Sequence, residues 1–222
     1  MTEYNLLLLL HLLLFVYWLG ADIGVFYGSR YVADASLSRE TRATALRIML
    51  WIDQIPRVCL VLILPVGYTL GFQLGLVETS SIAIGAVWIL AVAWLSLVLA
   101  IHHLQGTGLG ETLRKADMIL RVLIILGLSF DAWRSMAGAG HIQAPWMAVK
   151  MQIFALLIFF GLMIRVATQR FVVAFGRLMR EGSSEEIEAD ISTGLARAKP
   201  WVIAIWIGLV AAAFIGLQKP GF

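Results

Sequence analysis

Long runs of apolar residues, separated by short polar connections, dominate the pattern of this 222-residue chain. A helix needs about 20 predominantly apolar residues to cross the hydrocarbon core of a bilayer. Six segments qualify: residues 4–27, 45–72, 81–103, 116–133, 146–167 and 201–217. Helices are expected because backbone polar groups in lipid must be satisfied within their own segment, and the alternation typical of barrel strands is absent. The pattern therefore predicts an all-α, polytopic membrane bundle of six transmembrane helices, forming one domain over residues 1–222.

The composition identifies a lipid bilayer as the surrounding solvent. Hydrophobic residues make up 60% of the chain and charged residues 14%, and the mean hydropathy is +0.87. Ordinary soluble domains are nearer half apolar and a quarter charged. The first apolar run lacks the basic start and the cleavage site of a secretory signal, so we interpret it as a retained span. The single cysteine, Cys59, excludes a disulfide framework, and the net charge of +3 comes without a basic patch for nucleic acid.

Basic residues are concentrated in alternate connections between the apolar segments. The first, third and fifth connections carry or adjoin twelve of the seventeen: Arg30, Arg39, Arg42, Arg47, Arg114, Lys115, Arg165, Arg170, Arg177, Arg180, Arg197 and Lys199. The positive-inside rule places these three connections in the cytoplasm. Both termini are then expected outside, which in a bacterial inner (plasma) membrane means the periplasm.

Two of the cytoplasmic connections carry helix-capping signals. Ser36 or Ser38 precedes a run of good helix formers, and Gly182 is followed by a second possible cap at Ser183 or Ser184. We expect the second helix, and a hairpin formed by the fifth and sixth, to continue below the membrane.

Several polar side chains fall inside the first apolar segment. His11, Trp18 and Asp22 are spaced seven and then four residues apart, so they share one helix face. Ionisable groups in a span are costly and usually face the bundle interior. His11 lies about 10 Å inward at 1.5 Å per residue, too deep to be explained by interfacial water. It is therefore either a metal or haem ligand or a hydrogen-bonded histidine of the bundle.

Other charged residues in the apolar segments allow simpler interpretations. Asp53 and Arg57, and likewise Asp117 and Arg121, have the i,i+4 spacing of an ion pair on one helix, and each group could instead be neutralised by a partner on another helix. Arg165, near a helix end, is long enough to reach the lipid surface.

Lys150 is expected at nearly the depth of His11, because both helices enter from the outer side. A buried lysine readily loses its proton, so a free amine could ligate iron. Its ammonium could equally pair with a haem propionate, and the sequence does not choose between these roles.

Three stretches together resemble the bacterial HemJ-type protoporphyrinogen oxidases and, more loosely, the CopD-like membrane proteins. They are "HLLLFVYW" at residues 11–18, "PWMAVK" at 145–150 and the ending "QKPGF". The resemblance implies a haem b protein that oxidises protoporphyrinogen IX, in a pathway of porphyrin biosynthesis. It also implies that His11 and Lys150 take part in haem binding and activity.

The chain departs from the family pattern in three respects. The spacing between Trp18 and Arg30 is a few residues longer than in the family. HemJ-type proteins look like four-helix proteins, whereas this chain carries an extra predicted hairpin at 81–133. The stretch after the lysine, "FFGLMIRVATQRF", lacks the histidine that the family pattern leads us to expect.

The leading hypothesis is thus a haem-binding membrane oxidoreductase. His11 is its candidate metal ligand, Trp18 and Lys150 its further cofactor contacts, and Lys150, Asp22 and Arg57 its candidate catalytic residues. A porphyrinogen is the expected electron donor and a quinone the natural acceptor.

Two other functions stay open. A CopD-like copper-handling protein would use soft thioether ligands, for which Met147 and Met151 are the best placed. A non-catalytic subunit would assemble with copies of itself or with a larger membrane complex, through faces such as "SIAIGAVWILAVAW".

Overall fold

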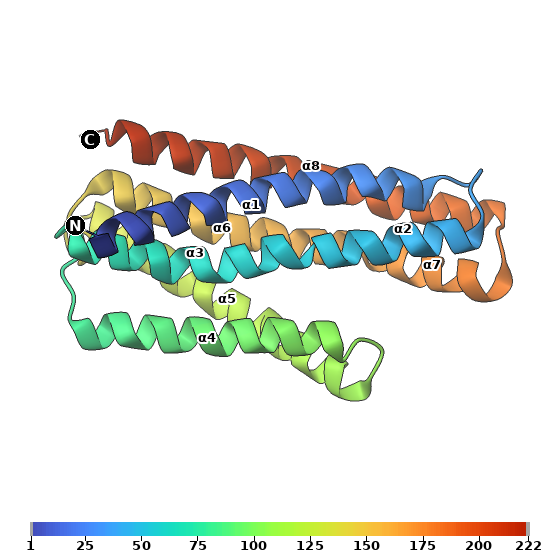
Figure 1. Cartoon of the computed structure of the whole chain (residues 1–222), viewed down its shortest axis with the longest axis horizontal. Coiled ribbons are helices and arrows are strands. Elements are labelled where there is room, and N and C mark those ends of the chain that lie inside the picture. The colour runs from blue at the N-terminus through green and yellow to red at the C-terminus, as the bar shows by residue number, and fades with distance from the viewer. Residues whose placement is uncertain (1, 221–222) are drawn as a thin grey trace.

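The computed structural model describes residues 2–220, which form eight α-helices arranged as six rods (Figure 1). The helices are α1 (Thr2–Ala33), α2 (Arg39–Ile52), α3 (Gln54–Gln73), α4 (Ser81–His103), α5 (Gly108–Met136), α6 (Pro145–Ala167), α7 (Gln169–Glu181) and α8 (Glu185–Gln218). Helix α2 continues into α3 after a single residue, Asp53, and α6 continues into α7 after Thr168. The predicted all-α bundle is confirmed, and residues 81–103 are helical with the predicted bounds.

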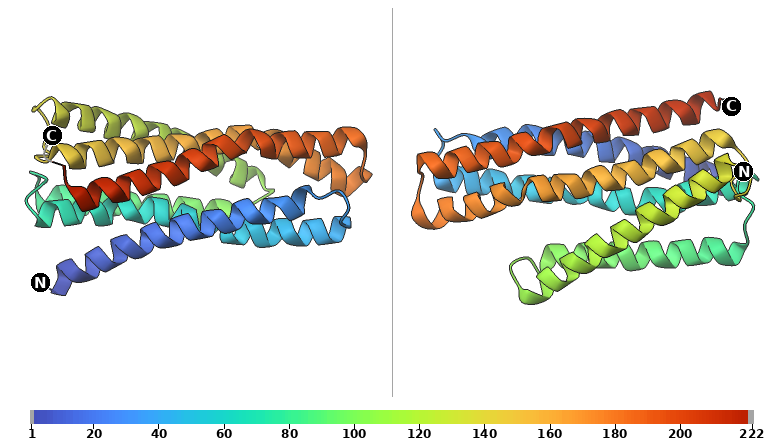
Figure 2. Two further views of the ribbon diagram at one scale, coloured as in Figure 1. Left: turned by 90° about the horizontal axis from the view of Figure 1, so that it is seen from above. Right: turned by 180° about the vertical axis from the view of Figure 1, so that it is seen from behind.

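Five of the six rods are long and apolar enough to cross a membrane, so the chain is a membrane protein. The rod that falls short is α5, because Asp117, Arg121 and Asp131 interrupt its apolar sequence. Helices α4 and α5 form the predicted hairpin, which is shorter than the other rods and lies to one side of them (Figure 1). Both ends of the described chain lie at the same end of the bundle (Figures 1 and 2).

The longest rods extend past the hairpin at the end formed by α2 and α7 (Figure 1). The α2–α3 rod covers 35 residues, or about 52 Å at 1.5 Å per residue, whereas the hydrocarbon core is about 30 Å thick. The predicted caps are present: Ser38 accepts a hydrogen bond from the Thr41 amide, and Ser184 accepts one from the Ile187 amide. Gly182 ends α7 with a φ of 92°, in the left-handed region that favours glycine. These rods are therefore longer than the hydrocarbon core is thick, and their extension beyond the membrane stays a prediction.

A buried arginine joins the extended ends of three helices. Arg42, on α2, is 1% exposed and donates from Nη1 and Nη2 to the two carboxylate oxygens of Glu188, on α8, at 2.7 and 2.8 Å. Its Nε donates to the Val32 carbonyl at the end of α1, at 2.9 Å. This contact fixes the position of α8 relative to α1 and α2, and so shapes the space between them.

Most of the outer surface is apolar. The side chain of Leu9 on α1 is 53% exposed, and that of Ile207 on α8 is 65% exposed. Such faces suit lipid, whereas the core at mid-bundle is built around Trp18, Trp94 and Leu157. The N-terminal half of α1 diverges from the C-terminal half of α8 (Figure 2). These two helix halves therefore do not cover each other's surface.

Candidate functional site

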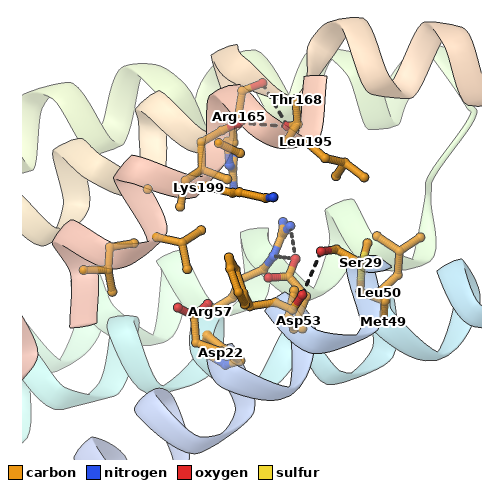
Figure 3. Close-up of a pocket in the computed structure, with 18 of the residues that line it drawn as sticks. Asp22, Ser29, Met49, Leu50, Asp53, Arg57, Arg165, Thr168, Leu195 and Lys199 are labelled. Carbon is orange, nitrogen blue, oxygen red and sulfur yellow. Dashed lines mark hydrogen bonds and ion pairs between the residues drawn. The ribbon is translucent and has the colours of Figure 1, made fainter. Parts of the chain in front are cut away.

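A cavity of about 290 Å³ lies among α1, the α2–α3 rod, the α6–α7 rod and α8. Most of its lining is apolar, including Phe26, Leu60 and Leu157. The polar side chains on its wall are Asp22, Ser29, Asp53, Arg57, Arg121, Arg165, Thr168 and Lys199, most of them drawn in Figure 3. An apolar hollow with a few convergent polar groups is the usual form of a small-molecule site.

The α1 side of the cavity carries the two residues predicted to share a face with His11. Trp18 is 2% exposed and packs edge-to-face on Phe154, with ring centroids 6.4 Å apart. Asp22 is 8% exposed and accepts a hydrogen bond from Trp206 Nε1 at 2.8 Å. Both predicted interior positions are confirmed, because each side chain is buried between α1 and a neighbouring helix.

Arg57 reaches the cavity from α3 and donates hydrogen bonds to Asp53. The predicted intrahelical ion pair is therefore present. Figure 3 shows this pair on one side of the cavity and Arg165 and Lys199 on the other. Lys199 comes from α8 and its side chain is exposed.

Asp117 is fully buried behind the cavity wall and receives three hydrogen bonds. Its donors are Trp94 Nε1 at 2.8 Å, Arg121 Nε at 3.0 Å and Arg165 Nη1 at 2.7 Å. The predicted Asp117–Arg121 pair is confirmed. The alternative that Arg165 extends to the lipid surface is wrong, because this guanidinium turns inward and bonds to the buried carboxylate.

Arg121 is 3% exposed, and its Nη2 has no hydrogen-bond partner among the described residues. Its guanidinium lies 5.3 Å from the centroid of the Trp94 ring. One arm of a buried cation therefore has no acceptor, and the residue that carries it lines the cavity. Buried polar atoms nearly always have one, so this arm calls for an explanation.

His11 and Lys150 form a second polar locus, and neither lines the cavity. The His11 ring packs against the backbone of Gly67 on α3, where a Cβ atom would come within 3.0 Å of Cε1. The Lys150 ammonium packs against Gly216 on α8, where a Cβ would come within 2.7 Å of Nζ. Lys150 is close enough for its charge to act on the imidazole, so these two groups from distant parts of the chain are brought near each other.

The His11 Nδ1 atom is buried and has no hydrogen-bond partner in the described part of the chain. The Lys150 Nζ atom lies 5.9 Å from the centroid of the Trp146 ring. The cavity is thus lined by three of the predicted site residues, Trp18, Asp22 and Arg57. The other two, His11 and Lys150, lie outside it.

Within residues 2–220, no group of three or more His, Cys, Asp or Glu side chains could hold a metal ion. A haem iron needs only one or two protein ligands, so this finding concerns only metal ions that are held by three or more side chains. Met147 and Met151, the candidate copper ligands, are 7% and 8% exposed and belong to a cluster of packed apolar side chains.

The sequence did not predict that Arg121, Arg165 and Lys199 would meet at one cavity. A signal was present in part: α5 carries a carboxylate within an apolar run, and such a group attracts cations from any helix that packs on it. Arg165 lies 48 residues from Asp117, so the sequence alone does not show this pairing.

Comparisons with known proteins add no relative: no family model, curated protein or solved structure matches the chain. The resemblance to HemJ-type proteins therefore rests on the residues quoted above.

Proposed function

We propose that this protein is a haem-binding membrane oxidoreductase of the HemJ type, with His11 as an iron ligand. The observation that carries the proposal is the buried His11 Nδ1 atom without a partner. Leaving a buried hydrogen-bonding atom unsatisfied costs about 1–3 kcal/mol, which a bond to iron would offset. A purely structural histidine would be expected to use this nitrogen in a hydrogen bond.

The residues around His11 suit haem in their chemistry. Imidazole is the commonest protein ligand of haem iron. The Lys150 amine, near the imidazole, would serve as a second ligand or as the counter-ion of a propionate. Gly67 and Gly216 let the imidazole and the amine pack directly on the backbone of α3 and α8, where any larger residue would displace them. A bound haem would supply one-electron redox chemistry, tuned by its ligands and by burial.

The cavity residues would act on a substrate rather than on the haem. Asp22 has no cation within ion-pair distance in the described structure, so its carboxylate is available to take up a proton from a bound molecule. Arg57, oriented by Asp53, would hold a polar group of that molecule in place. A porphyrinogen donor and a quinone acceptor fit this scheme, in a bacterial inner membrane with both termini on the periplasmic side.

An absorption spectrum of the purified protein tests the proposal directly. We expect a Soret band in protein from haem-sufficient cells, and loss of that band in His11→Ala while the helical circular dichroism is retained. His103→Ala is the matched control, because His103 is exposed at the end of α4, and it should keep the band. A wild-type protein that neither carries haem nor binds added hemin would refute the proposal.

Complementation then separates an enzyme from a haem-bearing subunit. Rescue of a porphyrinogen-oxidase-deficient bacterium by the wild type, but not by His11→Ala, would support turnover. A pigmented protein that fails to rescue would instead favour the subunit alternative. That alternative draws on the hairpin of α4 and α5, where Ile82 and Ile89 are 85% and 74% exposed.

A further inference from the structure

The cavity wall holds more positive than negative charge. Its cations are Arg57, Arg121, Arg165 and Lys199, and the carboxylates on or behind it are Asp22, Asp53 and Asp117. With every group charged, four cations against three carboxylates leave a net charge of +1. Lys199 is exposed, so the charge that requires a counter-ion is the buried part: Arg121 and Arg165 share one carboxylate, and unpaired charge at their depth is costly.

The excess is located at the pair of arginines that share Asp117. One carboxylate serves both Arg121 and Arg165, at 3.0 and 2.7 Å. Arg57 lines the same cavity as both of them. Mutual repulsion among these three groups would be relieved by an anion placed between them.

The unpartnered arm of Arg121 gives the position of that anion. Arg121 is 97% buried, and its Nη2 has no acceptor in the described residues although the side chain lines the cavity. Guanidinium groups donate in a planar fork that suits carboxylate and phosphate oxygens. Lys199, on the opposite helix, has no ion pair in the described structure and extends into the same space (Figure 3).

We propose that the cavity binds the acidic head of an amphiphile, a carboxylate or phosphate group carried on an apolar chain. Arg121, Arg165 and Lys199 would bind the head, and apolar lining residues such as Leu157 and Ile205 would contact the first carbons of the chain. A volume of about 290 Å³ is at the lower end of the range for small-molecule pockets, so it suits a head group and part of a chain. The inference is independent of haem binding, because His11 and Lys150 lie outside the cavity; the acidic amphiphile would take the place of the substrate proposed above for the same cavity.

The test uses the full chain in nanodiscs of phosphatidylcholine, titrated with oleate, with dioleoyl phosphatidic acid or with inorganic phosphate. Native mass spectrometry counts the bound acid, and its occupancy against concentration gives the affinity. We expect Lys199→Gln to weaken binding of the preferred acid about tenfold, the size of one lost charge-assisted hydrogen bond. Arg197→Gln, an exposed position on the same helix, is the matched control and should bind as the wild type does.

Arg165→Gln should weaken binding at least as much, but it also removes a partner of Asp117, so thermal unfolding must confirm that it folds. If it does not fold, Lys199→Gln still decides the outcome. A preference for oleate would identify a carboxylate ligand, and a preference for phosphatidic acid a phospholipid; either supports the proposal.

Three results would overturn the proposal. The first is that neither acid is retained by the wild type. The second is that Lys199→Gln binds as tightly as Arg197→Gln. The third is that inorganic phosphate binds as tightly as phosphatidic acid, which would indicate a site for a free anion. His11→Ala should keep its affinity for the acid, so failure of the haem hypothesis would leave this result unchanged.

Discussion

Replacing Arg42 by alanine should cost about 3–4 kcal/mol of the free energy of unfolding. The guanidinium is 1% exposed and makes both hydrogen bonds of a bidentate pair with Glu188. Removing one partner of a buried ion pair typically costs about 3–5 kcal/mol, because the other charge is left uncompensated. Glu188 is 19% exposed and also accepts a hydrogen bond from Ser183 at 2.7 Å, so the lower end of that range applies. The Val32 carbonyl loses its donor as well, which adds about 1 kcal/mol.

Unfolding in a titration with sodium dodecyl sulfate, from mild detergent micelles, measures this loss. Arg47→Ala is the matched control on the same helix, because Arg47 is exposed and makes only one long contact, to Thr44 at 3.5 Å; it should change stability by less than about 0.5 kcal/mol. Arg42→Lys should fall between the two, since it keeps the charge but loses the bidentate geometry. A loss below about 1 kcal/mol for Arg42→Ala would refute the view that this pair joins the extended helix ends.

Three further predictions concern packing, a buried hydrogen bond and pH. Gly194→Ala should destabilise by about 1–3 kcal/mol in the same titration, because its Cβ would lie 2.6 Å from a backbone nitrogen in α7; Gly161→Ala, with nothing within 4 Å, should instead stabilise by about 0.5–1 kcal/mol. Trp206→Phe should cost about 1–3 kcal/mol, because it leaves the buried Asp22 carboxylate without its donor. The guanidinium that binds Glu188, beyond the apolar part of α8, holds the pKa of this carboxyl below its ordinary value. The contribution of this ion pair to the free energy of unfolding is therefore complete above the ordinary glutamate pKa of about 4.3, and it is lost as the pH falls through the lower pKa of the folded state. Glu188→Gln removes the titrating group, so its free energy of unfolding should vary less between pH 3 and 6.

Local patterns predicted the helices well because lipid allows few alternatives. A long apolar run must be helical, and its capping residues act within one turn, so the neighbouring residues alone narrowed each cap to two serines, of which Ser38 and Ser184 are the ones used. The inward face of α1 was predictable for the same reason: residues spaced seven and four apart share one side of a helix, and Trp18 and Asp22 are both buried there.

Contacts between helices were not predictable from these patterns. The spacing of Asp117 and Arg121 indicated an ion pair but not its third member, Arg165 from α6. Nor did the sequence connect Arg42 with Glu188, which lie 146 residues apart. In each case a charged side chain pairs with a residue on another helix, although a neighbour on its own helix or water could also neutralise it. The packing of the rods determines which residue becomes its partner.

The buried face of α1 connects the two polar loci and explains why they differ in chemistry. His11 and Asp22 lie on it eleven residues apart, or about 16 Å along the helix axis. The arginines of the cavity lie at the Asp22 end, toward the basic connections, where an acidic head group would be neutralised. At the His11 end the nearby cation is the single amine of Lys150, and the unpartnered atom is a ring nitrogen, which suits a metal rather than an anion. The two proposed ligands therefore use opposite ends of one helix face, so variants at His11 and at Lys199 should separate their effects.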